Sequence, residues 1–376
     1  MKKFLFDVIL DRENICNLTE DAQMLIRGAE RGDHIIFYGR RNTGKTSLIK
    51  SIVIPEYKKL YKNSLILFVD FMGVKTTQHV SQRLRISYEQ SISAFQPTKQ
   101  FLVNLGKTFK NFRPTIGIDP ITSSPTFSLG VSQENKEPSI AELFRHIGKY
   151  HLENNSLIIM DEFQDIVMVD EAEGLFRDAM QNLPGNLSII ILGSKKHLLG
   201  KIFASGKSPL AGWGKYHEIS LITAEDFHEY MKGRLTPLGF QIDLETTKHI
   251  LKLSQNIPEP INIICENLTR TVKPGNVITN KLVDLSLSKV LEERHGLFEE
   301  YLARFTEKEL RFLVALSKNE PVAQPNSKNF LKQVNLSPGG NRPILMRLEN
   351  EAIIYKTEAG YVLADPLLSY FLKIYR

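Results

Sequence analysis

Residues 34–48 read HIIFYGRRNTGKTSL, and this stretch decides the fold. The apolar run His34–Tyr38 predicts a buried strand, Gly39–Thr46 fits the pattern GxxxxGK[ST], and a helix is expected to begin near Thr46. A strand, a glycine-containing loop and a helix in this order are the context in which the pattern forms a phosphate-binding P-loop. The loop N–H groups and the helix dipole favour a phosphate chain. The sequence therefore predicts a nucleotide site here.

Individual loop residues have individual expected roles. Lys45 is expected to contact the β- and γ-phosphates of ATP, and the Thr46 hydroxyl is expected to ligate Mg²⁺. Ser47 directly follows the pattern, and capping or packing is the favoured alternative for it. The residues predicted to bind nucleotide are Gly39, Arg40, Arg41, Asn42, Thr43, Gly44, Lys45, Thr46 and Ser47.

A second stretch, LIIMDE at 157–162, supplies two carboxylates. It predicts a buried strand ending in Asp161 and Glu162, and at the carboxyl end of a parallel strand both side chains can reach the crevice. Asp161 is expected to hold Mg²⁺ through water, as in a Walker B element. Glu162 is expected to polarise the attacking water as a general base. A strand ending in acids is a weak signal alone, and the upstream P-loop strengthens it.

A third apolar run, Leu187–Leu192, ends in Gly193 and Ser194. A polar residue at this point would lie between the other two motifs. Ser194 is therefore predicted to be catalytic, holding the water or the γ-phosphate. The alternative is a turn serine that caps the next helix.

Roughly the first 220 residues alternate apolar runs with helical stretches, which predicts an α/β fold with a parallel sheet flanked by helices. Most of the runs are near-continuous Ile, Leu, Val and Phe, as is typical of strands buried on both faces. Residues 114–131 interrupt the alternation with two short runs around a Pro/Ser-rich turn, which predicts an inserted β-hairpin. The main strands are expected at His34–Tyr38, Ser64–Phe71, Ser156–Asp161, Leu187–Ser194 and Tyr216–Leu221.

The rest of the chain predicts two further domains. Thr223 is a suitable N-cap, and amphipathic helices follow to about residue 290. From Phe305, helices are followed by two short strands around a turn, the order of a winged helix. We predict a P-loop core at residues 1–222, a helical lid at 223–300 and a winged helix at 301–376.

Composition excludes several classes of protein. The hydrophobic content of 42% and the charged content of 24% are those of an ordinary globular protein. Cys16 and Cys265 lie far apart, which argues against a disulfide framework or zinc site and fits a reducing cytoplasm. The N-terminus lacks the features of a signal peptide, and no apolar run approaches the ~20 residues that a membrane helix needs. The net charge of +6 allows a polyanionic partner without requiring one.

With these motifs in order, the chain resembles bacterial and archaeal AAA+ ATPases related to the STAND NTPases and to replication initiators. The helical lid contributes Asn256-Ile257-Pro258, similar to the family's GxP with Asn in place of Gly, and the resemblance implies a nucleotide contact for Pro258. The other matching segments are Arg12-Glu13, YGRR at 38–41, TGKTS at 43–47, PSIAEL at 138–143, DEFQ at 161–164 and Gly193-Ser194.

One departure from the family concerns catalysis between subunits. The resemblance implies an arginine shortly after Ser208-Pro209-Leu210, but the sequence continues AGWGK, with Lys215 as the nearby cation. Lysine is a point charge and a poor substitute for the bidentate arginine. An arginine finger contributes ~10³–10⁵ in rate where it exists. Slow, switch-like turnover is therefore expected, and a homo-oligomer is left open.

The C-terminal domain leaves its partner open. Its recognition helix is expected at Arg342–Asn350, with Asn341 as the cap and Pro343 in the first turn. Residues 305–376 contain ten Lys/Arg against seven Asp/Glu, less positive charge than DNA-binding faces concentrate. We therefore favour a slow, nucleotide-dependent switch ATPase with a protein-docking or autoinhibitory winged helix. The alternative is an initiator- or regulator-type ATPase that binds DNA through this domain. A small-molecule kinase is disfavoured because Glu162 suits water activation.

Overall fold

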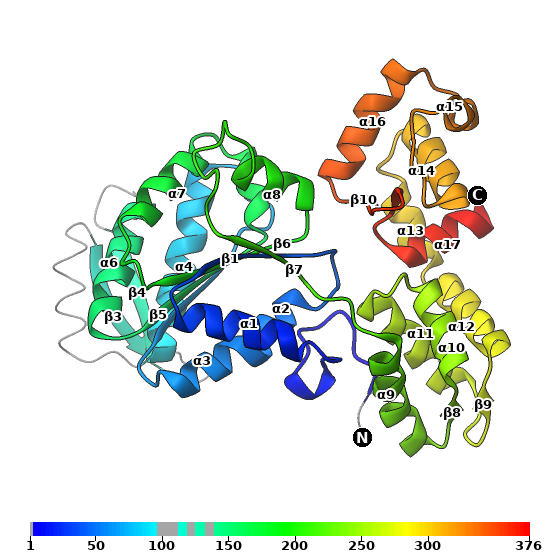
Figure 1. The fold of residues 1–376 in the computed structure, drawn as a ribbon, viewed down its shortest axis with the longest axis horizontal. Helices are drawn as coiled ribbons and strands as arrows, with labels where there is room; N and C mark the ends of the chain where they lie inside the picture. Colours follow the sequence, from blue (N-terminus) through cyan, green and yellow to red (C-terminus); the bar gives the residue numbers. More distant parts are fainter. Residues whose placement is uncertain (1–2, 96–111, 119–124, 132–138) are drawn as a thin grey trace. The chain divides into compact units, whose positions relative to one another are not determined.

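Five parallel strands form the central sheet, in the order β2-β5-β6-β1-β7 (Figure 1). β2, β5, β6 and β1 lie where the apolar runs predict them, and they consist mainly of Ile, Leu, Val and Phe because these strands are covered on both faces. β7 begins one residue before the predicted Tyr216–Leu221 and ends three residues before its predicted end. The fold class expected from the sequence is confirmed. The strands are β1 His34–Tyr38, β2 Leu65–Asp70, β5 Ser156–Asp161, β6 Ser188–Gly193 and β7 Lys215–Glu218.

The computed structural model describes residues 3–95, 112–118, 125–131 and 139–376. The chain divides into two compact units, each with its own core. One unit contains the sheet and comprises Thr19–Gly39 and Leu48–Ile219. The other comprises Met1–Leu18, Arg40–Ser47 and Ser220–Arg376.

Helices cover both faces of the sheet (Figure 1). One face packs on α4 (Thr77–Phe95), α6 (Ile140–Glu153) and α7 (Ala172–Gln181), and alternate strand residues such as Ile158 and Met160 join their core. The opposite face is covered by α1 (Thr19–Glu30) and α3 (Ile54–Leu60). The alternation follows from the two-residue period of a strand.

The helix after the P-loop is not uniform. It begins as α2 (Lys45–Leu48), continues as a π-helical stretch (Ile49–Val53) and ends as α3. Pro55 lies in the first turn of α3. Because proline lacks an N–H and clashes with the carbonyl four residues earlier, a widened turn before it keeps the helix continuous.

The predicted hairpin is present as two strands. β3 (Phe112–Ile118) pairs antiparallel with β4 (Pro125–Val131). The turn between them lies outside the described residues. The hairpin is tied to α4, because the Phe127 N–H donates to Ser93 Oγ at 2.9 Å.

The second unit is mostly helical, and one apolar core runs through it. Its helices begin at α9, where the predicted cap is confirmed: the Asp226 N–H donates to Thr223 Oγ1 at 3.1 Å. Two short strands, β10 (Ile354–Lys356) and β11 (Tyr361–Leu363), pair antiparallel as the wing. The helices are α9 Ala224–Leu235, α10 Leu244–Leu253, α11 Pro258–Thr271, α12 Asn280–Glu293, α13 His295–Leu302, α14 Glu307–Asn319, α15 Lys328–Val334, α16 Pro338–Asn350 and α17 Pro366–Tyr375.

The expected start of the recognition helix is wrong. α16 begins four residues before the predicted Arg342, with Ser337 as N-cap and Pro338 in the first turn. Asn341 is fully buried inside the helix, and its side-chain amide donates to the Pro325 carbonyl at 2.9 Å. Two successive glycines, 339 and 340, resemble a turn, but the Ser337 cap supports a helix through them.

Within the described part of the chain, no helix is both long and apolar enough to span a lipid bilayer.

Candidate functional site

The strand order brings three sequence motifs to one edge of the sheet. β6 lies between β5 and β1, with Tyr38 in register with Gly193 and Met160 with Ile191. The carboxyl ends of parallel strands share one edge, so Asp161 at the end of β5, Ser194 after β6 and Gly39 after β1 lie on the same side. The Gly39 N–H donates to the Gly193 carbonyl at 3.2 Å. Ser194 directly follows the strand that lies between the strands of the other two motifs, as predicted.

Glu162 occupies an unusual backbone position directly after β5. Its φ of 47° is in the left-handed region, which non-glycine residues rarely adopt. The Ser194 hydroxyl, which is nearly fully buried, donates to Glu162 Oε2 at 2.8 Å. Ser194 does not cap the following helix α8 (Lys196–Phe203), whose N-cap is Lys195 without a side-chain bond. The serine therefore faces the predicted base.

Three further polar residues at this edge were missed by the sequence analysis. The buried Gln164 donates through Nε2 to Glu162 Oε2. Lys195 Nζ lies 2.9 Å from Asp165 Oδ1, and the Gly73 N–H donates to Asp165 Oδ2 at 2.9 Å. The sequence could have indicated these residues, because they directly follow the DE and GS motifs at the ends of β5 and β6.

Asp161 ends β5 and is 5% exposed. Its Oδ1 accepts the Glu162 N–H at 2.9 Å. Asp70, at the end of β2, is in register with it and adds a carboxylate that the sequence analysis did not single out. No cluster of three or more His, Cys, Asp or Glu in metal-binding arrangement occurs among the described residues. Mg²⁺ is usually bound by one or two carboxylates together with water and phosphate oxygens.

The P-loop has the backbone expected of a phosphate cradle. Gly44 adopts a φ of 91° and Asn42 a φ of 62°. Only glycine takes the first conformation without cost, and asparagine tolerates the second. Lys45 is 5% exposed, and its Nζ donates to the Arg40 carbonyl at 2.7 Å. The ammonium is thus directed into the loop, where it fits the role of a phosphate ligand.

Arg40 connects the P-loop to the helical and winged-helix segments of its unit. Its Nη2 donates to Gln255 Oε1 at 2.9 Å, to the Leu363 carbonyl at 3.2 Å and to the Ala364 carbonyl at 3.3 Å. The guanidinium also lies 5.3 Å from the centre of the Tyr355 ring. Burial lowers the pKa of Arg40. A loop residue is therefore held by the segment before α11 and by the wing.

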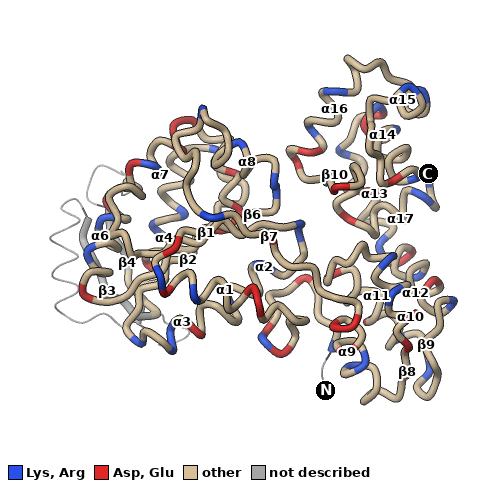
Figure 2. Tube along the Cα trace, viewed as in Figure 1, with Lys and Arg blue, Asp and Glu red and all other residues tan. Residues whose placement is uncertain are grey.

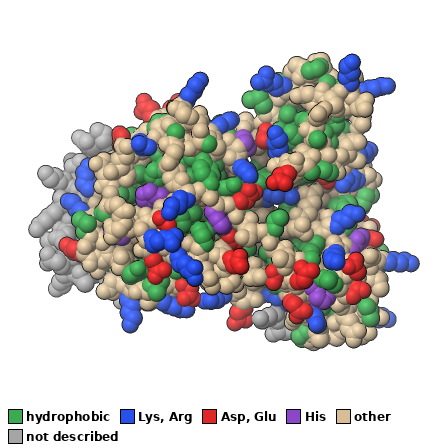
Figure 3. Space-filling view, viewed as in Figure 1, with side chains coloured by type: hydrophobic (Ala, Val, Ile, Leu, Met, Phe, Trp, Pro, Cys, Tyr) green, Lys and Arg blue, Asp and Glu red, His purple; other side chains and the backbone are tan. Residues whose placement is uncertain are grey.

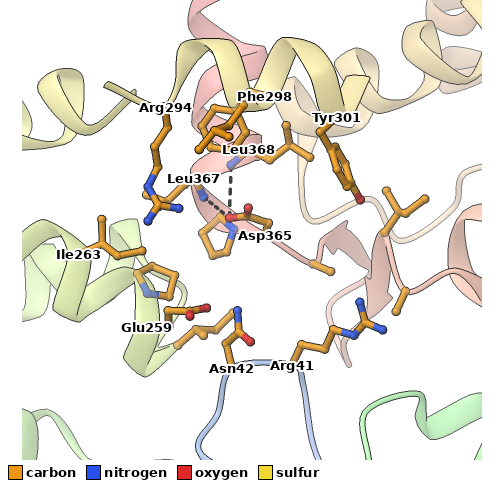
Figure 4. A pocket seen from close by; sticks show the side chains of 17 residues that line it. Arg41, Asn42, Glu259, Ile263, Arg294, Phe298, Tyr301, Asp365, Leu367 and Leu368 are labelled. Atoms are coloured by element: carbon orange, nitrogen blue, oxygen red, sulfur yellow. Dashed lines mark hydrogen bonds between the residues drawn. The ribbon is translucent and has the colours of Figure 1, made fainter. Parts of the chain in front are cut away.

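Next to Arg40, the same unit contains a cavity of about 310 Å³ (Figure 4). Arg41 and Asn42 enter it from the P-loop, and Glu259, Arg294 and Asp365 approach from the helices. Burial raises the pKa of the Asp365 carboxyl, which caps α17. The volume is at the lower end of small-molecule sites.

The remaining predicted residues have structural contacts. The Leu10 N–H donates to Ser47 Oγ at 3.0 Å, which agrees with the packing alternative. Pro258 begins α11, and Asn256, at the position of the family's glycine, has a φ of 58°. Lys215 lies on β7 with its Nζ 2.7 Å from Asp33 Oδ1.

Comparisons with known proteins support the fold. Residues 296–374 match a family described as "Probable winged helix domain". No curated protein matches the chain in sequence. The Walker-type ATPase PABY2304 of Pyrococcus abyssi is similar in structure, with a TM-score of 0.67 and 19% identity over 99% of each chain. The Orc1 protein of Aeropyrum pernix, solved in complex with DNA, has a TM-score of 0.50 and 12% identity, covering 98% of this chain and 94% of that one. The chain thus has the fold of a P-loop ATPase, with a parallel sheet flanked by helices, a helical segment and a C-terminal winged helix.

Proposed function

We propose that this protein binds ATP with Mg²⁺ in the P-loop and hydrolyses it slowly, as a switch whose state is transmitted to the winged helix. The assignment to the STAND-related group rests on the motif resemblance and is part of this proposal. An unidentified protein is the favoured partner of the C-terminal domain.

The residues divide the chemistry as follows. Lys45 and the loop N–H groups hold the β- and γ-phosphates, while Thr46 and Asp161 hold the metal, Asp161 through water. Mg²⁺ supplies charge neutralisation on the phosphate oxygens. Glu162 accepts a proton from the attacking water, and Ser194 orients the Glu162 carboxylate. Pro258 is proposed to contact the nucleotide from the lid.

The switch role is carried by the contacts of Arg40. This residue belongs to the nucleotide-binding loop, yet its guanidinium is bound by Gln255 and by the wing carbonyls of Leu363 and Ala364. A rearrangement of the loop on nucleotide exchange that moves Arg40 would also strain or break its bonds to Gln255 and to the wing. Because hydrogen bonds to charged groups contribute about 1.5–3 kcal/mol, they are strong enough to couple the two events.

The test is nucleotide release from two variants that break the contact from opposite ends. Arg40→Ala removes the donor, and Gln255→Ala removes an acceptor without changing the loop. Both are expected to change the release rate of a fluorescent ADP by about fivefold or more, the range of typical coupling energies. Lys332→Ala, an exposed site on α15, is the control. Release unchanged in both variants would contradict the switch.

The second candidate function is a DNA-binding ATPase of the initiator or regulator type. The DNA complex of the similar Orc1 protein and the exposed Arg342 favour it. Arg347, however, is held by Glu309 at 2.5 Å and by Glu351 at 2.9 Å. Acids alternate with Lys and Arg along α14 (Figure 2), and on the face shown in Figure 3 the positive side chains of this domain are scattered. The stretch between Glu320 and Glu349, in contrast, contains four cations and no acid: Lys328, Lys332, Arg342 and Arg347.

A gel shift at graded salt separates the two functions. If the winged helix binds DNA, its affinity for DNA should fall steeply as the salt concentration rises, and Arg342→Ala should lower that affinity further. If no DNA binding is seen even at low salt, the second candidate function is wrong.

A further inference from the structure

The glutamine of the DEFQ motif has no role in the proposed chemistry, yet it is completely buried next to the proposed base. Gln164 Nε2 donates to Glu162 Oε2 and lies 3.4 Å from Asp165 Oδ1. Ser194 Oγ donates to the same Glu162 oxygen at 2.8 Å. Two donors, one directly after β6 and one in the segment after β5, therefore converge on one carboxylate oxygen.

Gly193 explains why the glutamine amide faces this way. A Cβ built on Gly193 would lie 2.4 Å from Gln164 Oε1, closer than real Cβ contacts allow. The amide oxygen is packed against the backbone of β6, and it has no hydrogen-bond partner among the described residues. Nε2 is consequently directed to the carboxylates. The glycine of the GS motif and the glutamine of the DEFQ motif form one packed unit.

We propose that Gln164 is a positioning residue for Glu162. This inference rests on the proposed hydrolysis. The donors from Gln164 and Ser194 fix Oε2, so Oε1 is the oxygen that takes the proton of the attacking water. In that step an O–H bond of the water breaks as the Oε1–H bond forms. The remaining hydroxide forms an O–P bond to the γ-phosphorus while the bond from that phosphorus to the β,γ-bridging oxygen breaks, so that oxygen leaves with ADP. Without the clamp, the carboxylate rotates among several orientations, and few of them suit proton transfer.

A purely structural role is the competing explanation. Buried amides often serve to satisfy buried polar neighbours and stabilise a core. Loss of such an amide lowers the stability of the fold. Loss of a positioning residue lowers kcat with little change in ATP affinity, and this difference decides between the two roles.

The test uses Gln164→Met, which keeps the length of the side chain and removes both the donor and the amide oxygen. We expect kcat to fall about 10- to 100-fold, with the Kd for ATP within about threefold of wild type. Gln164→Glu replaces the donor by a carboxylate facing Glu162 and is expected to lower kcat at least as far. Gln181→Met, at an exposed site on α7, is the matched control and keeps wild-type kcat. Thermal unfolding of each variant reports the change in stability.

Combining Gln164→Met with Ser194→Ala sharpens the result. If the two donors act as one unit, the double variant loses about as much kcat as the more damaging single variant, because the effects of residues that act as a unit are not additive. Wild-type kcat in folded Gln164→Met would overturn the positioning role, as would equal losses of kcat and ATP affinity.

Failure of the underlying hydrolysis proposal has a different signature. If Glu162→Gln itself retains wild-type turnover, Glu162 is not the base and the proposed function is wrong. If Glu162→Gln is inactive while Gln164→Met is fully active, only the positioning role is wrong.

Discussion

The carboxylate edge of the sheet and the P-loop are held by different parts of the molecule. At the edge, Glu162 is bound by Gln164 and Ser194, all within the unit that contains the sheet. In the P-loop, Arg40 is bound by Gln255 and by carbonyls at the end of the wing, all within the other unit. The position of Glu162, the proposed base, therefore depends on the sheet itself, whereas Arg40 in the loop is held by segments more than 200 residues away.

Under the proposed function, this difference assigns catalysis to the edge of the sheet and switching to the loop. A base clamped by its own sheet is prepared for proton transfer before nucleotide arrives, which suits a catalytic group. When nucleotide exchange changes the conformation of a loop that is bound to the helical segment and the wing, it can also shift the conformation of those segments, as a switch requires. Perturbing the edge should change turnover, and perturbing the loop should change affinity.

The largest expected effect is that of Glu162→Gln at the edge. The amide keeps the shape of the side chain and removes the base, so kcat is expected to fall about 10²–10⁴-fold while ATP still binds. Phosphate release at saturating ATP measures kcat, and calorimetry measures binding. Loss of ATP binding in this variant would contradict the proposal that the edge determines turnover and the loop determines affinity.

Lys45→Ala tests the loop. It removes an ammonium expected to contact two phosphates, and such charged contacts contribute about 1.5–3 kcal/mol each. ATP affinity is therefore expected to fall about 100-fold or more by calorimetry. Unchanged affinity would show that the loop is not the nucleotide site.

Gly44→Ala probes the loop backbone with a smaller effect. At a φ of 91° an alanine costs about 1–2 kcal/mol, which predicts a roughly 5- to 30-fold loss of ATP affinity if binding requires this conformation. Gly275 has the same φ of 91° and open space around it. Gly275→Ala should lower the free energy of unfolding by a similar amount without changing affinity. Equal affinities in the two variants would show that binding does not select this loop conformation.

Lys215→Ala has the smallest expected effect. In the structure Lys215 is paired with Asp33, and the slow-switch proposal predicts unchanged turnover that does not rise with protein concentration. The bond from Lys215 lowers the pKa of Asp33. The pair therefore stabilises the fold above the ordinary Asp pKa, and this contribution disappears as pH falls through the lowered value. For so exposed a lysine we expect less than about 1 kcal/mol.

A dependence of activity per chain on protein concentration would contradict the proposal that Lys215 has no catalytic role. A steep rise of activity per chain with concentration, lost in Lys215→Ala, would identify Lys215 as a finger acting between subunits. The protein would then be an assembling enzyme, and part of its catalytic edge would come from a second copy.

The sequence alone determined the elements with strong local signals. The four apolar strands of the sheet and the hairpin are predicted by apolar runs and turn residues, because a buried strand must be apolar wherever it lies. The polar strand β7 was placed less accurately. The P-loop is predicted by its glycines and lysine, whose chemistry is contained in eight consecutive residues. The cap at Thr223 is equally local. Where a local signal was ambiguous, as with the glycines before Asn341, the helix start was predicted wrongly.

The tertiary structure alone decided which distant polar groups meet. Arg40 and the Leu363 carbonyl are 323 positions apart, and Ser194 and Glu162 are 32 apart. Their bonds depend on strand order and on the packing of whole segments, and neither leaves a pattern in the neighbouring sequence. The requirement for glycine at position 193 has the same origin, since it depends on a glutamine amide brought there by the adjacent strand. Hydrogen bonds need distances and angles that only the packed fold supplies.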